Sequence, residues 1–306
     1  MTLKSASKDM NWPKISIITP SFNQARYLER TIRSVLDQGY PNLEYIVIDG
    51  GSTDGSVDII RRYGDQIAWW CSEPDGGQSD ALNKGFLRAS GDIIGWLNSD
   101  DLYCESTLYR VGTHFLCHPE SEAAHGSLYI IDEKDSLIDA FWAGRFTRFQ
   151  PRYIFHVGLN FHQQTIFWRK ELFDRIGLID VELKFSMDRD FILRILTQSR
   201  FATLRGYLGA FRVHSEAKTS TMIDVSVSED GLIKERYKQF FPPIVAGFPR
   251  LNYLLLRFYR MVSLIVDAPV SYLAYRLGHK IGISVPINWL RREPLLVNRN
   301  EGCNFQ

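Results

Sequence analysis

The chain has 306 residues, of which 45% are hydrophobic and 23% are charged, and its formal net charge is +1. This size and apolar content suffice for one large core with an appendage, and the near-neutral charge gives no reason to expect a nucleic-acid partner. Residues 1–5 lack the apolar core of a signal peptide, and the four cysteines show neither metal-type spacing nor a paired framework. We therefore expect a cytoplasmic protein.

The N-terminal part of the chain alternates between strand and helix patterns. Residues 15–20 form an apolar run that ends in proline, and residues 28–36 repeat apolar side chains with the period of a helix. Residues 43–49 predict a second strand, and the glycine-rich residues 50–55 predict a turn into another helix. This alternation predicts an α/β fold with parallel strands and right-handed crossovers.

A third apolar run, residues 93–97, leads into Asn98, Ser99, Asp100 and Asp101. Parallel strands end at the same edge of a sheet, so three strand ends should meet, at Thr19, Asp49 and Asn98. Carboxylates at such an edge favour a hard divalent cation that also contacts substrate phosphates. The alternative is that Asp100 and Asp101 only cap a helix that starts near Glu105.

Four blocks of the chain carry a family pattern in the right order and spacing: IITPSFN at 17–23, VIDGGSTDG at 47–55, SEPDGGQSDALNKG at 72–85 and LNSDD at 97–101. These blocks resemble the family 2 glycosyltransferases, which have the nucleotide-diphospho-sugar transferase fold, and the third block is similar to one subgroup of bacterial surface-polysaccharide enzymes. The resemblance covers about residues 14–220. It implies a Rossmann-like fold with a mostly parallel central sheet and a helical C-terminal appendage.

The resemblance also implies that the loops after the strands bind a nucleotide-diphosphate sugar. The implied donor-binding residues are Pro20, Ser21, Asn23, Asp49, Gly51, Ser52, Asp75, Asp80, Lys84, Asn98 and Ser99. Two positions depart from the family: Gly50 stands where a second aspartate often follows Asp49, and Asn98 replaces the first acid of Asp-x-Asp. Asp100 is then the better ligand for Mn²⁺ or Mg²⁺, and the missing carboxylate should weaken the metal site.

Two histidines are candidates for the site. His214 falls where the family often has a late histidine that completes the metal site, and the flanking Arg212 and Lys218 are placed to meet the diphosphate. His162 is a candidate for the acceptor side. For both histidines, a structural role in the core is the alternative.

A catalytic base is implied near residue 188. Asp188 precedes a helical apolar series and occupies the position of the family's catalytic aspartate, although Met187 stands where glutamate usually precedes it. A carboxylate within hydrogen-bond reach of the acceptor hydroxyl can take its proton. We assign Asp188 as the general base, with Asp190 as its rival and a plain helix cap as the structural alternative.

The tail differs from the rest of the chain. We divide the protein into a catalytic domain, residues 1–243, and a basic, apolar helical region, residues 244–306. The tail has eight basic and three acidic residues, a net charge of +5, which leaves −4 for the remainder. Charges interrupt its apolar runs, so a membrane-spanning helix is not expected. The tail instead predicts contact with an anionic membrane surface, or else a packing element on the core or on a second subunit.

These features predict a metal-dependent inverting glycosyltransferase that moves a sugar from a nucleotide-diphosphate donor to a saccharide or lipid-linked saccharide acceptor. Surface polysaccharide biosynthesis at the inner face of the plasma membrane fits this reading. One alternative is a catalytically silent sugar- or nucleotide-binding module, suggested by Asn98 and Met187. A nicotinamide-dependent oxidoreductase is disfavoured, because no Gly-x-Gly-x-x-Gly follows the first strand.

Overall fold

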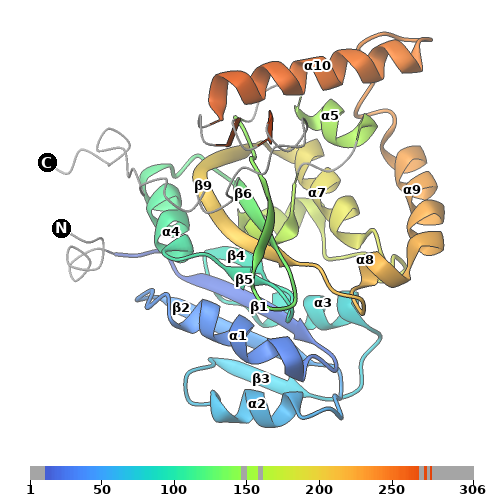
Figure 1. Ribbon diagram of the computed structural model, residues 1–306. Helices are drawn as coiled ribbons and strands as arrows, with labels where there is room; N and C mark the ends of the chain where they lie inside the picture. Colours follow the sequence, from blue (N-terminus) through green and yellow to red (C-terminus); the bar gives the residue numbers. More distant parts are fainter. Residues whose placement is uncertain (1–10, 146–149, 158–160, 269–271, 274–275, 278–306) are drawn as a thin grey trace, which may run out of the picture.

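The computed structural model describes residues 11–145, 150–157, 161–268, 272–273 and 276–277. Its centre is a nine-stranded sheet in the order β3-β2-β1-β4-β8-β6-β9-β5, with β7 paired to β6 (Figure 1). The strands are β1 (Ile15–Ser21), β2 (Leu43–Asp49), β3 (Trp69–Ser72), β4 (Ile93–Trp96), β5 (Leu102–Tyr103), β6 (Ala123–Ile131), β7 (Leu137–Phe141), β8 (Phe167–Arg169) and β9 (Phe201–Arg212).

Helices cover both faces of this sheet. They are α1 (Ala25–Leu36), α2 (Ser56–Arg62), α3 (Gln78–Arg88), α4 (Thr107–Cys117), α5 (Gln150–His156), α6 (Phe173–Ile176), α7 (Met187–Gln198), α8 (Lys218–Thr221), α9 (Ile223–Tyr237) and α10 (Pro249–Asp267). Two short 3₁₀ turns, η2 (Gln163–Thr165) and η3 (Lys170–Leu172), flank β8. One hydrophobic cluster joins α1, α2 and α4 to the sheet, and a second joins α3, α5, α7 and α9 to it.

The predicted α/β fold with a mostly parallel central sheet is confirmed. β1 lies between β2 and β4 and is parallel to both, with Ser21 beside Asp49 and Ile18 beside Trp96. Every residue of β1 is buried, as its apolar run indicates. Because β1, β2, β3 and β4 are parallel, their carboxyl ends open on one edge, as the alternation of elements predicts.

The second half of the sheet contains antiparallel pairs that the sequence pattern does not reveal. β8 is antiparallel to both β4 and β6, whereas β6 and β9 are parallel. β9 also pairs with β5, the strand that follows the acidic tip of β4, residues 98–101. The long strand β9 therefore brings the residues that follow it back to the edge where β4 ends.

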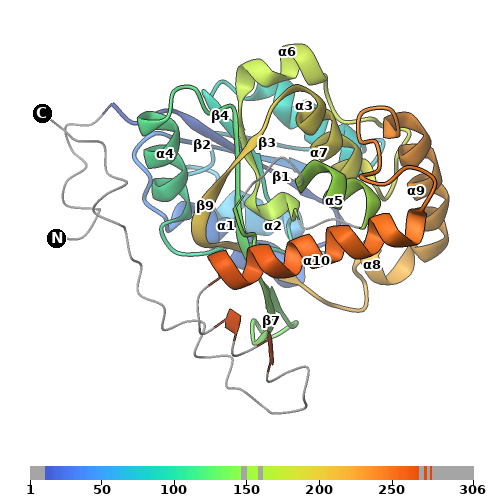
Figure 2. The same ribbon diagram turned by 90° about the horizontal axis from the view of Figure 1, so that it is seen from above.

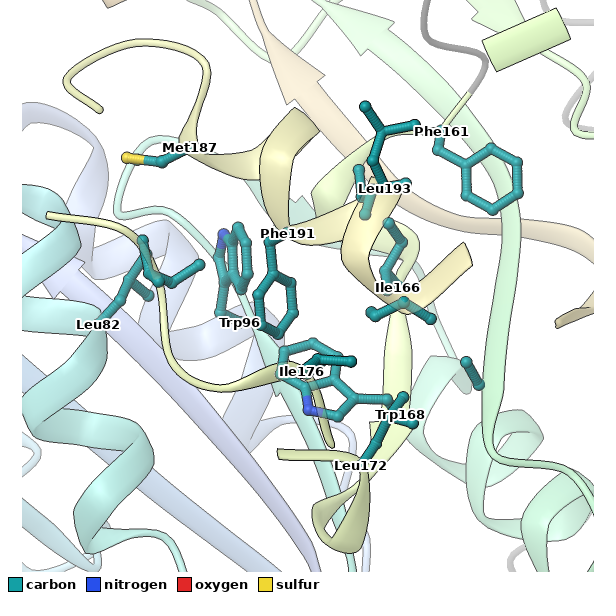
Figure 3. Close-up of a cluster of buried hydrophobic side chains, with 14 of the residues drawn as sticks. Leu82, Trp96, Phe161, Ile166, Trp168, Leu172, Ile176, Met187, Phe191 and Leu193 are labelled. Carbon is teal, nitrogen blue, oxygen red and sulfur yellow. The ribbon is translucent and has the colours of Figure 1, made fainter. Parts of the chain in front are cut away.

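Aromatic side chains fill the larger core between the sheet and α7. Figure 3 shows Trp96 from β4, Trp168 from β8 and Phe191 from α7 packed together, with Met187 at the start of α7 near Leu82. The rings of Trp168 and Phe191 lie 5.0 Å apart, centroid to centroid, in an edge-to-face arrangement. This packing fixes where α7 begins relative to β4.

The C-terminal part of the described chain is helical, as the tail pattern predicts. Figures 1 and 2 both place α10 along the outside of the molecule, next to α5. No helix in the described part of the chain is long and apolar enough to cross a membrane. The predicted region 244–306 extends beyond residue 277, and its remaining residues lie outside the described ranges.

The cysteines differ in state. Cys71 is a free cysteine, whereas Cys117, at the last position of α4, is disulfide-bonded. The spacing of the cysteines in the sequence does not by itself show which of them pair.

Candidate functional site

The acidic tip after β4 is held from below by helix α1. Thr31 Oγ1 donates to the carbonyl oxygens of Ser99, at 2.9 Å, and Asp101, at 2.8 Å. Asp101 is fully buried and accepts hydrogen bonds from Gln164 Nε2, at 2.7 Å, and from the Arg212 amide, at 2.9 Å. Burial, together with the neighbouring Asp100 charge, raises the pKa of Asp101 well above its usual range. Asp101 thus supports the tip from inside the fold.

The structure contradicts the capping alternative for the two aspartates. Helix α4 begins at Thr107, and its N-cap is Ser106. Asp100 and Asp101 come several residues earlier, before β5. Neither carboxylate reaches the helix terminus, so neither acts as its cap.

Asp100 and His214 form a pair at the end of β4. The Nε2 atom of His214 lies 3.0 Å from Oδ2 of Asp100, and the histidine ring is buried 4.8 Å from the Tyr27 ring, centroid to centroid. Asp100 remains partly exposed. The buried imidazole can offer one ring nitrogen to a cation, and the more accessible carboxylate can offer its oxygens. Both kinds of atom are suitable ligands for Mn²⁺. In the described ranges, no group of three or more His, Cys, Asp or Glu side chains comes together as a complete metal site.

Arg212 does not face the site, contrary to the expectation that it meets the diphosphate. Its side chain is completely buried, with its guanidinium over the Tyr27 ring. Nε donates to the Asp100 carbonyl at 2.7 Å, Nη1 donates to the Asp132 carbonyl at 2.9 Å, and the guanidinium pairs with Asp135. Arg212 therefore braces the tip from behind, because its buried guanidinium is held by other groups of the protein.

The loops after β1 and β2 are joined by hydrogen bonds. The Asn23 amide donates to Ser52 Oγ at 2.7 Å, and the Thr53 amide donates to Asn23 Oδ1 at 2.9 Å. The buried Asp49 carboxylate accepts from the Gly51 and Ser52 amides and from the Ser52 and Ser72 hydroxyls. Asn23 takes a left-handed φ of 52°, which asparagine tolerates better than most residues. Six of the predicted donor residues share this edge: Pro20, Ser21, Asn23, Asp49, Gly51 and Ser52.

Asp75 occupies the space that a second aspartate after Asp49 would need. A Cβ placed on Gly50 would lie 3.0 Å from Asp75 Oδ2, and one on the left-handed Gly51 would lie 3.3 Å from the Pro74 nitrogen. Asp75 also accepts from the Gly77 amide at 2.7 Å. The glycine at position 50 therefore leaves room for a carboxylate that comes from the loop after β3.

The start of α3 carries the remaining donor candidates of this loop. Asp80 Oδ2 accepts from the Gly76 amide at 3.0 Å and lies 3.5 Å from Lys84 Nζ. Lys84 also pairs with Glu73 at 3.2 Å. The ammonium thus lies among acidic groups, and these contacts stabilise the loop that precedes α3.

A chain of polar contacts links the tip of β4 to α8. Gln78 Nε2 donates to Asn98 Oδ1 at 2.8 Å, and Lys218 Nζ donates to Gln78 Oε1 at 2.8 Å. Burial lowers the pKa of Lys218, while the charges of Asp188 and Asp100 oppose that shift. The negative charges of both carboxylates therefore favour the charged form of Lys218. Sequence reasoning overlooked Gln78, although it lies within one of the family-like blocks.

Asp188 is the second residue of α7 and is half-buried. Burial raises its pKa, while its hydrogen bond from the Arg189 amide, at 2.7 Å, acts in the opposite direction. The preceding residue, Met187, is buried in the core, and its sulfur accepts from Ser79 Oγ at 2.9 Å. A buried methionine side chain therefore occupies the position where the family usually has glutamate.

Glu229 holds the start of α7 in place. Its carboxylate, on α9, accepts from three successive backbone amides, those of Lys184 at 2.7 Å, Phe185 at 3.0 Å and Ser186 at 2.7 Å. These amides precede the first turn of α7, where backbone N–H groups lack partners within the helix. No local pattern marks Glu229, because its partners lie more than forty residues earlier in the chain.

Asp190 has a structural environment. It is fully buried, and its carboxylate contacts Arg194 Nε at 2.9 Å, Arg236 Nη1 at 2.6 Å and the Tyr237 hydroxyl at 2.8 Å. These contacts tie α7 to α9. Protein partners thus occupy both carboxylate oxygens of Asp190.

His162, the candidate for the acceptor side, directly precedes η2, whose Gln164 contacts Asp101. It packs edge to face against Phe141, with 4.8 Å between ring centroids, and burial lowers its pKa to about 4. The imidazole is therefore neutral at physiological pH. Its surroundings fit the structural alternative as well as a contact with an acceptor.

The sequence has recognisable relatives. Residues 16–177 match the sequence profile of Glycosyl transferase family 2. An uncharacterized glycosyltransferase of Mycobacterium tuberculosis is 33% identical over 202 residues, which cover 65% of this chain and 75% of that protein. An uncharacterized glycosyltransferase of Rickettsia typhi is 28% identical over 269 residues, which cover 79% and 82%. A Bacillus subtilis protein named as a putative teichuronic acid biosynthesis glycosyltransferase is 41% identical over 104 residues, 33% of this chain and 41% of that protein.

Solved structures share the fold. The S. aureus TarS 1–349 structure in complex with UDP-GlcNAc has a TM-score of 0.54 and 16% identity, covering 88% of this chain and 92% of that one. The mannosyltransferase of Pyrobaculum calidifontis in complex with GDP-Man and Mn²⁺ has a TM-score of 0.52 and 16% identity, covering 90% and 82%. At such identity, the likeness shows the nucleotide-sugar transferase fold.

Proposed function

Because the chain belongs to glycosyl transferase family 2, we propose that it transfers a sugar from a nucleotide-diphosphate donor to a saccharide or lipid-linked saccharide acceptor. We further propose that the reaction requires Mn²⁺ or Mg²⁺, inverts the anomeric carbon and serves surface polysaccharide assembly at the inner face of the plasma membrane. Two solved structures of the same fold are complexes, one with UDP-GlcNAc and one with GDP-Man and Mn²⁺. One relative by sequence is named as a putative teichuronic acid biosynthesis glycosyltransferase. Family membership also argues against the nicotinamide-dependent alternative.

The observation that carries this proposal is the pairing of Asp100 with His214. Their Oδ2 and Nε2 atoms lie 3.0 Å apart, so Asp100 and His214 would together hold one divalent cation. The donor diphosphate would complete its set of ligands. The cation would supply positive charge that stabilises the leaving diphosphate.

The remaining site residues have roles that do not depend on the cation. Asp188 takes the proton from the attacking hydroxyl, and its raised pKa makes it a stronger base than an exposed aspartate. Lys218 compensates the negative charge that the donor brings between Asp100 and Asp188. Asn98 and Ser99 hydrogen-bond the ribose or the phosphates. One displacement with a single base gives inversion.

The loops at the other strand ends form the donor subsite in this proposal. Pro20 and Ser21 end β1, Asn23 follows it, and Gly51 and Ser52 lie after β2, where Asp49 shapes the turn through its four accepted hydrogen bonds. Asp75 lies in the loop between β3 and α3, and Asp80 and Lys84 lie in the first two turns of α3. The glycine at position 50 gives the donor pocket a different outline from that of relatives with two aspartates.

The experiment is a donor screen with the full-length protein. Release of nucleoside diphosphate is measured with UDP-, GDP- and dTDP-sugars, first with EDTA and then with Mn²⁺ restored. We expect one donor class to turn over only with the metal. Asp188→Asn should lower kcat by about 100-fold or more with nearly unchanged donor binding.

Matched variants make this test specific. Asp65→Asn removes an exposed carboxylate far from these loops and should leave kcat unchanged. Asp190→Asn should mainly reduce stability, and a larger loss of kcat than in Asp188→Asn, at equal folded fraction, would identify Asp190 as the base. Donor binding without turnover of any donor would indicate the catalytically silent module instead.

A further inference from the structure

Helix α10 exposes an apolar face along its length. Eight large apolar side chains at helical spacing point outward, and we call them the outward stripe: Leu251, Leu254, Leu255, Phe258, Met261, Val262, Ile265 and Val266. Leu254 is 62% exposed, Phe258 60% and Val266 73%. A helix on the surface of a soluble core normally presents these residues inward, so the pattern indicates a second apolar surface that this face contacts.

The inward side of α10 attaches the helix to the core largely through polar groups. Asn252, Leu256 and Arg260 are buried at intervals of four residues. Arg260 donates to the carbonyl oxygens of Trp142 and Ala143, and Asn252 Oδ1 accepts from the Ile244 amide at 2.7 Å. These contacts determine which face of α10 turns outward, so the exposure of the stripe follows from the packing of the helix.

Positive charge flanks the outward stripe. Arg250 and Arg257 are exposed on α10. The one acidic residue of α10 is Asp267, its last residue. An apolar helix face bordered by arginines matches the two regions of an anionic bilayer surface, the acyl boundary and the negatively charged headgroups.

We propose that α10 docks the protein on an anionic membrane leaflet, with the outward stripe in the interfacial region and Arg250 and Arg257 at the headgroups. The helix lies parallel to the surface, because no helix in the described ranges is long and apolar enough to cross a membrane. This inference deepens the proposed function, since it identifies the surface that brings the enzyme to a lipid-linked acceptor.

A second copy of the chain fits the stripe less well. In an antiparallel two-fold pair of α10 helices, the residue at the centre of Pro249–Asp267 meets its own copy. That residue is Phe258, so the adjacent Arg257 would lie near its own copy. The two like charges would repel each other in an apolar interface.

The test is co-sedimentation of the full-length protein with vesicles, without any donor, so that its outcome is independent of the proposed transferase activity. The probes are vesicles of phosphatidylcholine alone and of phosphatidylcholine with 30% phosphatidylglycerol. We expect binding to the anionic vesicles only, and weaker binding at 0.5 M NaCl because salt screens the arginines. The double variant Leu254→Glu/Phe258→Glu should lower the partition coefficient at least 10-fold.

The control is Leu87→Glu, which places one glutamate charge at a leucine that is 74% exposed on α3. It should bind vesicles like the wild type. Should the double glutamate variant fold poorly, Arg250→Gln/Arg257→Gln tests the electrostatic part alone and should lower binding several-fold. The proposal is overturned by wild-type protein that ignores anionic vesicles at low salt, by binding that these variants leave unchanged, or by a dimer in light scattering that the glutamates dissociate.

Discussion

The Glu229 carboxylate gives a quantitative test of how the start of α7 is positioned. In Glu229→Gln, one acceptor oxygen becomes an amide nitrogen that can only donate. The better orientation keeps the oxygen on the Phe185 and Ser186 amides, at 3.0 and 2.7 Å, and leaves the Lys184 amide facing an NH₂ group. One charge-assisted hydrogen bond is lost, at about 1.5–3 kcal/mol, and two become neutral, at somewhat less than 1 kcal/mol each. We expect a total loss of about 3–5 kcal/mol.

The variant should also affect turnover, because Ser186 directly precedes Met187 and the proposed base, Asp188. With a looser first turn of α7, kcat should fall about 10-fold while the donor KM stays within about threefold, as misplacement of a catalytic group costs rate more than affinity. Stability is measured by urea denaturation, and kinetics are measured at a temperature where the variant is fully folded.

Glu235→Gln is the matched control on the same helix. Glu235 is exposed, with a side-chain exposure of 72%, and pairs with Lys238 at the surface. Such a pair contributes at most about 1 kcal/mol, so neither stability nor kcat should change appreciably. If Glu229→Gln behaves like Glu235→Gln in both measurements, the three amide contacts do not position the base and the reasoning is wrong.

Three further predictions concern charge and pH. Asp100→Asn should abolish Mn²⁺-dependent turnover and should weaken Mn²⁺-dependent donor binding, measured by calorimetry, by at least 10-fold. The melting temperature should change little. Unchanged turnover would remove Asp100 from the metal site. Activity should fall as pH drops through the pKa of Asp188, which burial raises above the ordinary value near 3.9, so a wild-type kcat/KM profile that is flat to pH 4 would argue against this base. Burial lowers the pKa of His125 from 6.5 to about 3, so below pH 6.5 the unfolded chain binds more protons than the folded protein. The contribution of His125 to the free energy of unfolding is therefore fully present above pH 6.5 and decreases as the pH falls toward 3. His125 should contribute up to about 1.4 kcal/mol per pH unit in this window, and urea titrations of His125→Gln should show a shallower acid slope than the wild type.

The sequence alone determined the framework of the fold. Apolar runs and helical spacing report which side of each element is buried, because burial repeats with the geometry of the strand or helix itself. Strand β1, helix α1 and strand β2 therefore lie where the pattern predicts them. The convergence of their ends with the tip of β4 follows from the handedness of parallel crossovers.

Only the tertiary structure distinguished between neighbouring acids. Asp188 and Asp190 are two positions apart on α7, about 200° around the helix, so they face different surroundings. Asp190 faces Arg236 and Tyr237 from α9, which a local pattern does not contain. At the tip of β4, Asp101 turns into the core toward Gln164, whereas Asp100 meets His214.

Partners distant in the chain explain the other differences. Arg212 was expected to meet a diphosphate, but its partners Asp132 and Asp135 come from the segment between β6 and β7. The Glu229 carboxylate likewise reaches amides more than forty residues away. The periodicity of apolar residues in the sequence indicates only which face of a helix or strand is buried. The partner of a charged side chain depends on which elements the fold packs together, so these contacts required the three-dimensional structure.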